Sequence, residues 1–127
     1  MKAETAGYLA RAHEDLGEAR QIFRISLAKV AARSAYYAAF HAAEAYILEK
    51  SGKVVKTHKG VRTEFARLMR SGPDQRRSMT TFLAQAYRYK ELSDYSTDPS
   101  EVVSLDDAEA VIASAAEFLQ WVENSLT

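Results

Sequence analysis

The sequence predicts an all-α protein, an antiparallel up-and-down bundle of four to five helices. Apolar residues recur at steps of three and four along most of the chain, which is the period of an amphipathic helix. The runs that could start strands, Val54-Val55 and Val102-Val103, are too short to build a sheet. Short connections between the helices favour antiparallel neighbours, and hence an up-and-down bundle.

The first two helices are expected over residues 4–24 and 27–50. Ser51-Gly52 is a stop signal for the second helix, because glycine readily adopts the left-handed conformation that ends helices. The apolar stripe of the first helix consists of Tyr8, Leu9, Ala12, Leu16, Ala19 and Phe23.

Three further helices are expected in the second half of the chain. Thr57 can cap the start of a third helix, and the segment 71–74 is expected to end that helix. A fourth helix carries Met79, Phe82, Leu83 and Ala86, and the polar stretch 93–104 is expected to be a loop. Ser104 and Asp107 have the spacing of a capping box at the start of a last helix, over about 105–126.

The second helix is apolar on nearly every side between residues 35 and 48. A helix of this kind is surrounded by protein. We expect it to form the centre of the bundle on one side and the contact of a homodimer on another.

Length and composition indicate one globular domain over residues 1–127. The chain is 47% hydrophobic and 27% charged, which is typical of folded, soluble domains. It has no cysteine, which excludes a disulfide framework, a zinc finger and a cysteine nucleophile. No signal-peptide pattern and no membrane-spanning run is present, so we expect a cytoplasmic protein that does not associate with a membrane.

A net charge of zero hides an uneven charge distribution. Residues 50–90 hold eleven basic and two acidic side chains, whereas residues 91–127 hold nine acidic and no basic ones. Such asymmetry indicates an anion-binding region, or two neighbouring helices of opposite sign that attract each other.

Arg33, Tyr37, His41 and Glu44 follow one another on the second helix at steps of four, four and three. These steps are close to whole helical turns, so the four side chains lie along one side of the helix. A histidine that hydrogen bonds to a carboxylate can act as a general base. The alternative is a core histidine whose hydrogen bonds are satisfied by Glu44 or by a backbone carbonyl.

Two further segments could hold an anion or a structural pair. The free N–H groups of a helix start at Thr57-His58-Lys59-Gly60 could bind a phosphate, or the segment could be an ordinary capped start. Arg88 and Asp94 are six residues apart and share a face only if the helix ends between them. The alternative is that Arg88 and Asp94, with Tyr95 beside them, form an ion pair whose role is structural.

No metal site and no cofactor is expected, because the three histidines, at 13, 41 and 58, share no ligand spacing.

Three segments together resemble small prokaryotic HEPN-domain proteins. They are the run from Ser34-Ala35-Tyr36-Tyr37 to Phe40-His41-Ala42-Ala43, the segment Thr57-His58-Lys59-Gly60-Val61, and the element from Arg88 to Ser93-Asp94-Tyr95. Their order and the acidic last helix fit as well, and the resemblance covers nearly the whole chain.

The resemblance implies a helical bundle that usually dimerises and is often encoded beside a minimal nucleotidyltransferase. Many HEPN proteins are metal-independent ribonucleases or toxins, and others bind nucleotides or serve as partners. The resemblance implies a ligand held by Arg33, Tyr37, Lys59 and Arg88 and, in an active enzyme, catalysis by His41, His58 and Arg88. Glu44, Asp94 and Tyr95 would support the site.

The sequence departs from the ribonuclease pattern of the family at two places. No histidine follows Arg88, and Asp94 stands near its expected position. Ser34 stands where relatives carry an arginine, and Arg33 lies one residue earlier. The favoured hypothesis is a nucleotide- or RNA-associated module that acts with a nucleotidyltransferase in a toxin–antitoxin-like pair. The alternatives are an active metal-independent ribonuclease toxin and a non-catalytic structural or regulatory dimerisation subunit.

Overall fold

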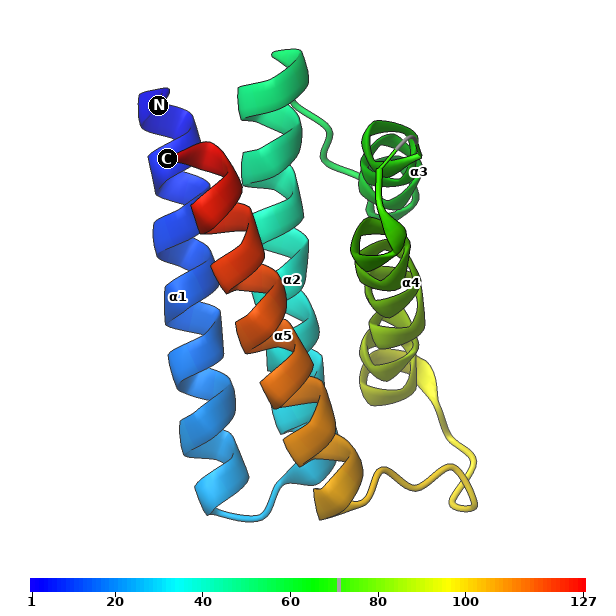
Figure 1. Ribbon diagram of the computed structural model, residues 1–127. Coiled ribbons are helices and arrows are strands. Elements are labelled where there is room, and N and C mark those ends of the chain that lie inside the picture. Colours follow the sequence, from blue (N-terminus) through cyan, green and yellow to red (C-terminus); the bar gives the residue numbers. More distant parts are fainter. Residues whose placement is uncertain (71) are drawn as a thin grey trace.

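A computed structural model describes residues 1–70 and 72–127, without the side chains of residues 74 and 75. Its helices are α1 (Ala3–Arg24), α2 (Ala28–Ser51), α3 (His58–Met69), α4 (Asp74–Tyr95) and α5 (Leu105–Leu126). No strand occurs in the residues described, and the predicted all-α bundle is confirmed (Figure 1).

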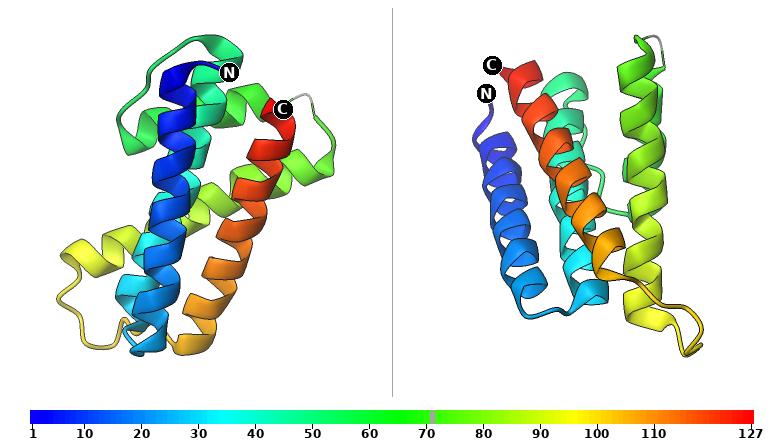
Figure 2. Two further views of the ribbon diagram at one scale, coloured as in Figure 1. Left: turned by 90° about the vertical axis from the view of Figure 1, so that its left-hand side faces the viewer. Right: turned by 60° about the horizontal axis from the view of Figure 1, so that its bottom comes forward.

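The helix α2 lies at the centre of the bundle. It contacts all four other helices, with α1 and α5 on one side and the short α3 and the long α4 on the other (Figures 1 and 2). The long helices α1, α2, α4 and α5 alternate in direction along the chain, so both termini lie at one end of the bundle (Figure 1). The α1–α2 turn and the α4–α5 loop lie at the opposite end.

The predicted helix signals are found in the structure. Thr57 Oγ1 accepts a hydrogen bond from the Gly60 N–H at 3.0 Å and caps α3. Ser104 and Asp107 form the complete capping box of α5. Gly52 closes α2 with a left-handed φ of 73°, a conformation that glycine adopts without steric cost.

The end of α4 differs from the prediction. Residues 93–95 were expected in the loop, but α4 continues through Tyr95 and the loop begins at Ser96. Asp94 forms a tertiary ion pair with Arg33 of α2 and a local one with Lys90, one turn earlier on α4, and both support a last turn of polar residues. The expected stop of α3 includes Ser71, which lies outside the described residues.

The interior of the bundle buries most of α2. Tyr36, Phe40 and Tyr46 are each at most 5% exposed, and the alanines from Ala31 to Ala45 are fully buried. The apolar character of α2 is therefore explained within one chain, without a second subunit. None of the helices in the described part of the chain is long and apolar enough to cross a membrane.

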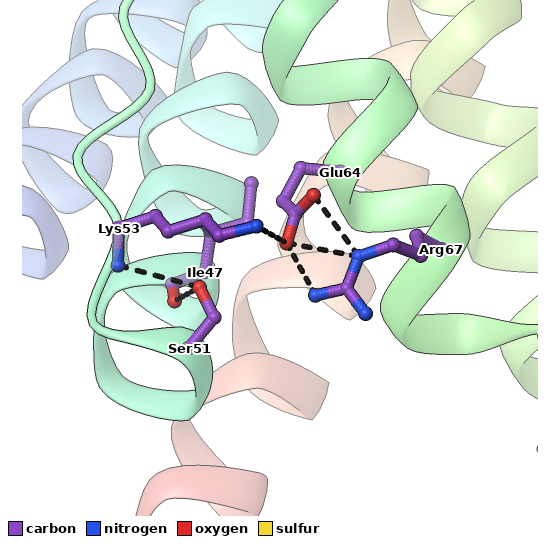
Figure 3. Close-up of polar contacts among 5 residues, drawn as sticks. All are labelled: Ile47, Ser51, Lys53, Glu64 and Arg67. Atoms are coloured by element: carbon purple, nitrogen blue, oxygen red, sulfur yellow. Dashed lines mark hydrogen bonds and ion pairs between the residues drawn. The ribbon is translucent and has the colours of Figure 1, made fainter.

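A polar network fixes the start of α3 relative to the end of α2. Lys53, in the connection, lies 3.6 Å from Glu64 Oε1, and Arg67 pairs with both oxygens of the same carboxylate (Figure 3). Ser51 Oγ donates to the Ile47 carbonyl and accepts from the Lys53 N–H. This network holds in place the helix that carries His58 and Arg62.

Candidate functional site

Aromatic rings from α2 and α4 surround His58 at the start of α3. The His58 ring lies 4.6 Å from the Phe40 ring and 5.3 Å from the Tyr87 ring. Its Nδ1 lies 2.7 Å from the hydroxyl of the fully buried Tyr36. Burial raises the pKa of Tyr36, so its phenol keeps its proton. It shares a hydrogen bond with Nδ1, and the tautomer of His58 sets which group donates.

The environment favours the neutral form of His58. Burial lowers the pKa of His58 below its ordinary value, and the nearby positive charges of Lys90 and Arg62 lower it further. Two cations therefore lie close to this ring, one from α4 and one from α3.

Arg62 lies one turn after His58 and stacks on Tyr87, with its guanidinium carbon 4.1 Å from the ring centroid. Its Nη1 is buried and has no hydrogen-bond partner among the described residues. No carboxylate in the described part of the chain lies within 4 Å of this guanidinium. A buried donor without a partner costs free energy unless a ligand or water satisfies it.

Lys90 comes from α4 and is only 8% exposed. Its Nζ lies 4.8 Å from the centroid of the Tyr95 ring and 5.9 Å from that of Tyr87. The Tyr95 hydroxyl is 3.4 Å from Nζ, and the Tyr95 side chain is largely exposed. Lys90 thus continues the line of positive charge from Arg62 toward the end of α4.

Arg33 of α2 completes the group. Its guanidinium lies 4.9 Å from the centroid of the Tyr37 ring, and its Nε donates to Asp94 Oδ1 at 2.6 Å. Lys90 Nζ lies 3.5 Å from the other oxygen, Asp94 Oδ2. Burial tends to raise the pKa of Asp94, but the hydrogen bond and charge of Arg33, together with Lys90, hold it below its ordinary value.

Three cations and three tyrosines form two groups that Asp94 joins through Arg33 and Lys90, and we call them together the cation–tyrosine cluster. It consists of Arg33, Arg62, Lys90, Tyr37, Tyr87 and Tyr95.

His41 lies beside this cluster but is held by two carboxylates. Its Nδ1 is 2.7 Å from Glu44 Oε1, and its Nε2 is 3.5 Å from Asp15 Oδ2 on α1. Burial raises the pKa of Asp15, and the charges of His41 and Arg11 oppose that shift. Both ring nitrogens of His41 therefore face acidic partners, and the ring links α1 to α2. This is the arrangement of the core-histidine alternative.

Lys59 lies apart from the cluster, and Arg88 approaches it only at Tyr95, with which it lines a hollow at the end of α4. Lys59 is exposed at the start of α3, where the Thr57 hydroxyl already takes the Gly60 N–H. Arg88 is exposed on another face of α4 and lines a hollow of about 550 Å³ between α4 and α5, together with Tyr89 and Asp107. Because α4 does not end between Arg88 and Asp94, these two side chains point to different faces.

Sequence reasoning missed four residues around the cluster, and helical spacing could have found them. Arg62 lies four residues after His58, and Lys90 and Tyr87 lie four and seven residues before Asp94. Each step is one or two helical turns and keeps the side chains on one face. Tyr36, the fourth, was noted only as part of the apolar run.

The basic segment 50–90 and the acidic segment 91–127 form little ion pairing with each other among the described residues. Among the ion pairs of the described residues, the pair Lys90–Asp94 is the one that joins the basic segment 50–90 to the acidic segment 91–127. Lys53 and Arg67 are neutralised within the basic segment by Glu64. In the same part of the chain, no three histidine or acidic side chains are placed to hold a metal ion.

Comparison with known proteins identifies the family. The model of the HEPN domain matches residues 6–125, nearly the whole chain. The chain belongs to the HEPN family. A relative at the sequence level is a Methanocaldococcus jannaschii protein named "Putative toxin MJ0605", which is 28% identical over 127 residues. The match covers 99% of the present chain and 91% of that protein.

Proposed function

We propose that this HEPN protein binds RNA or a nucleotide through the cation–tyrosine cluster and acts with a nucleotidyltransferase partner in a toxin–antitoxin-like pair. The observation that carries the proposal is the convergence of Arg33, Arg62 and Lys90 from three different helices onto tyrosine rings. The name of the M. jannaschii relative supports the toxin-like role.

The chemistry of the cluster suits a nucleic-acid strand. Arginine and lysine attract phosphate groups, and tyrosine rings stack on unpaired bases with little dependence on sequence. Arg62 offers a donor without a protein partner, and Tyr95 offers an exposed ring beside Lys90. A bound phosphate would supply the anion that Arg62 lacks in the chain itself.

The geometry favours binding without cleavage. Acid–base catalysis on RNA needs a histidine free to exchange protons beside a cation that stabilises the transition state. His41 is held between Glu44 and Asp15, and Arg88 lies on another face. His58 lies beside two cations, but burial and these charges lower its pKa, so it is a poor proton donor near neutral pH. We expect labelled RNA to stay intact in the presence of EDTA. Cleavage that His58→Ala abolishes would instead establish the ribonuclease alternative.

The homodimer and the nucleotidyltransferase partner are part of this proposal. Sedimentation velocity of the purified protein tests the dimer, and co-purification of a nucleotidyltransferase with this protein from its source cells tests the partner. A protein that forms these assemblies but binds no RNA or nucleotide would match the structural-subunit alternative.

The binding test compares Arg62→Gln with Arg20→Gln, which removes the same charge from the exposed face of α1. Fluorescence anisotropy with a labelled single-stranded RNA, and competition by ATP, measure affinity over a range of salt concentrations. A hydrogen bond to a charged group contributes about 1.5–3 kcal/mol, so Arg62→Gln should weaken binding about tenfold or more. The slope of log affinity against log salt should fall by about one.

Equal affinities of the two variants would exclude the cluster as the binding site. If ATP does not compete with the RNA, the ligand is the polynucleotide rather than the free nucleotide.

A further inference from the structure

We propose that the Asp94 carboxylate occupies the position of a ligand phosphate in the free protein, and that binding of RNA or nucleotide displaces it. This inference rests on the proposed function of the cation–tyrosine cluster. Arg33 Nε contacts Asp94 Oδ1 at 2.6 Å, and Lys90 Nζ lies 3.5 Å from Asp94 Oδ2. One carboxylate thus presents its two oxygens to two cations from two helices, as a phosphate group does.

The position of Asp94 in its helix makes this carboxylate easy to displace. It is the penultimate residue of α4, directly before the loop 96–104. The C-terminal end of a helix carries partial negative charge, which disfavours an acidic side chain there. Arg33 and Lys90 hold Asp94 in place against this effect, so its position depends on two cations that a competing anion can take over.

The site is accessible from solvent. The side chains of Arg33 and Asp94 are 36% and 23% exposed, and that of Lys90 is 10% exposed. Rotation of the Asp94 side chain uncovers both cations without movement of the bundle core. Tyr37 lies against Arg33, and Tyr95 lies against Lys90, so tyrosine rings flank the position that a phosphate would take.

The cluster therefore has two kinds of cation. Arg62 has no carboxylate within 4 Å among the described residues, whereas Arg33 and Lys90 share Asp94. A ligand that contacts Arg62 alone leaves Asp94 in place, and a longer strand gains Arg33 and Lys90 by displacing it. Asp94 thus lowers the affinity of ligands that reach Arg33 and Lys90, and leaves a single phosphate on Arg62 unaffected.

The test compares Asp94→Asn with Glu109→Gln, which removes one acidic charge from an exposed position on α5. Both raise the net charge by one, and the binding of a labelled 5′-phosphorylated single-stranded RNA is measured at constant salt. We expect Asp94→Asn to bind about tenfold more tightly than Glu109→Gln. The expected gain should shrink when Arg33→Gln is present, because the competition acts through that cation.

Affinity of Asp94→Asn equal to or below that of Glu109→Gln would overturn the inference. If the wild type then still binds RNA through Arg62, the proposed function survives and only the role of Asp94 fails. Absence of RNA binding by both the wild type and Asp94→Asn would overturn both proposals.

A second measurement needs no substitution. In the wild-type protein labelled with ¹³C at aspartate carboxylates, the Asp94 signal should shift on titration with the same RNA, because the carboxylate leaves its cations. An Asp94 signal that stays unchanged in the bound protein would contradict displacement.

Discussion

At the scale of single residues, the cations around His58 determine how its protonation affects folding. Lys90 and Arg62 lie near the ring, and burial, followed by their charges, lowers the pKa of His58 in the folded protein. Between that lowered value and the unfolded value of about 6.5, the unfolded chain binds more protons than the folded one. The contribution of neutral His58 to stability is therefore fully present above pH 6.5 and is lost as the pH falls.

We predict that the wild type loses more free energy of unfolding between pH 7.5 and pH 5 than the variant His58→Gln. Glutamine cannot take up a proton beside the two cations, so this source of acid destabilisation disappears. Urea unfolding at the two pH values measures the difference. His13→Gln, on the exposed side of α1, is the control and should keep the loss. An identical loss in wild type and His58→Gln would show that neither burial nor the cations lower the pKa of this ring.

At the scale of helices, local sequence predicted most of the fold. Thr57 and Ser104 mark helix starts through side-chain bonds to their own backbone, and such bonds depend only on neighbours in sequence. The continuation of α4 to Tyr95 was not predicted, because Asp94 is held there by Arg33, 61 residues away in sequence. Periodicity shows which residues share a face of one helix and not which helices meet.

Helical periodicity also explains which residues of the candidate site could be predicted, because it relates residues within one helix and not residues on different helices. Arg33, Tyr37, His41 and Glu44 were selected because they share one face of α2, and the structure does bring Arg33 against Tyr37 and His41 against Glu44. The approach of Arg62 and Lys90 depends on how α3 and α4 pack on α2, which no local pattern encodes. The uneven charge indicated the segment that supplies them but not the individual side chains.

We predict that Ser104→Ala lowers the free energy of unfolding by about 1 kcal/mol. The substitution removes the acceptor for the Asp107 N–H at 2.9 Å and breaks the capping box of α5. Ser78→Ala, at an exposed position within α4, is the control and should change stability by less than about 0.5 kcal/mol. Chemical denaturation measures both. Equal stabilities of the two variants would mean that the cap contributes nothing.

At the scale of the whole molecule, the bundle separates two faces of α4. Tyr87 and Lys90 face α2 and α3, with Arg62 and Tyr37 nearby. Tyr89 and Arg88 instead line the hollow toward α5, where Asp107 adds an acidic group. A nucleic-acid strand carries one negative charge per phosphate. We therefore expect it to bind the face of α4 toward α2 and α3, and not the face toward α5.

The most direct test of this claim is photocrosslinking of the wild-type protein to single-stranded RNA that contains 4-thiouridine, followed by tryptic mapping of the adducts. Tyr87 and Tyr89 are both half-buried, lie on one helix and fall on different peptides, because trypsin cleaves at Arg88. We predict adducts on Tyr37, Tyr87 or Tyr95 and none on Tyr89. Adducts confined to Tyr89 or to the helix α5 would contradict this prediction and place the ligand in the hollow between α4 and α5.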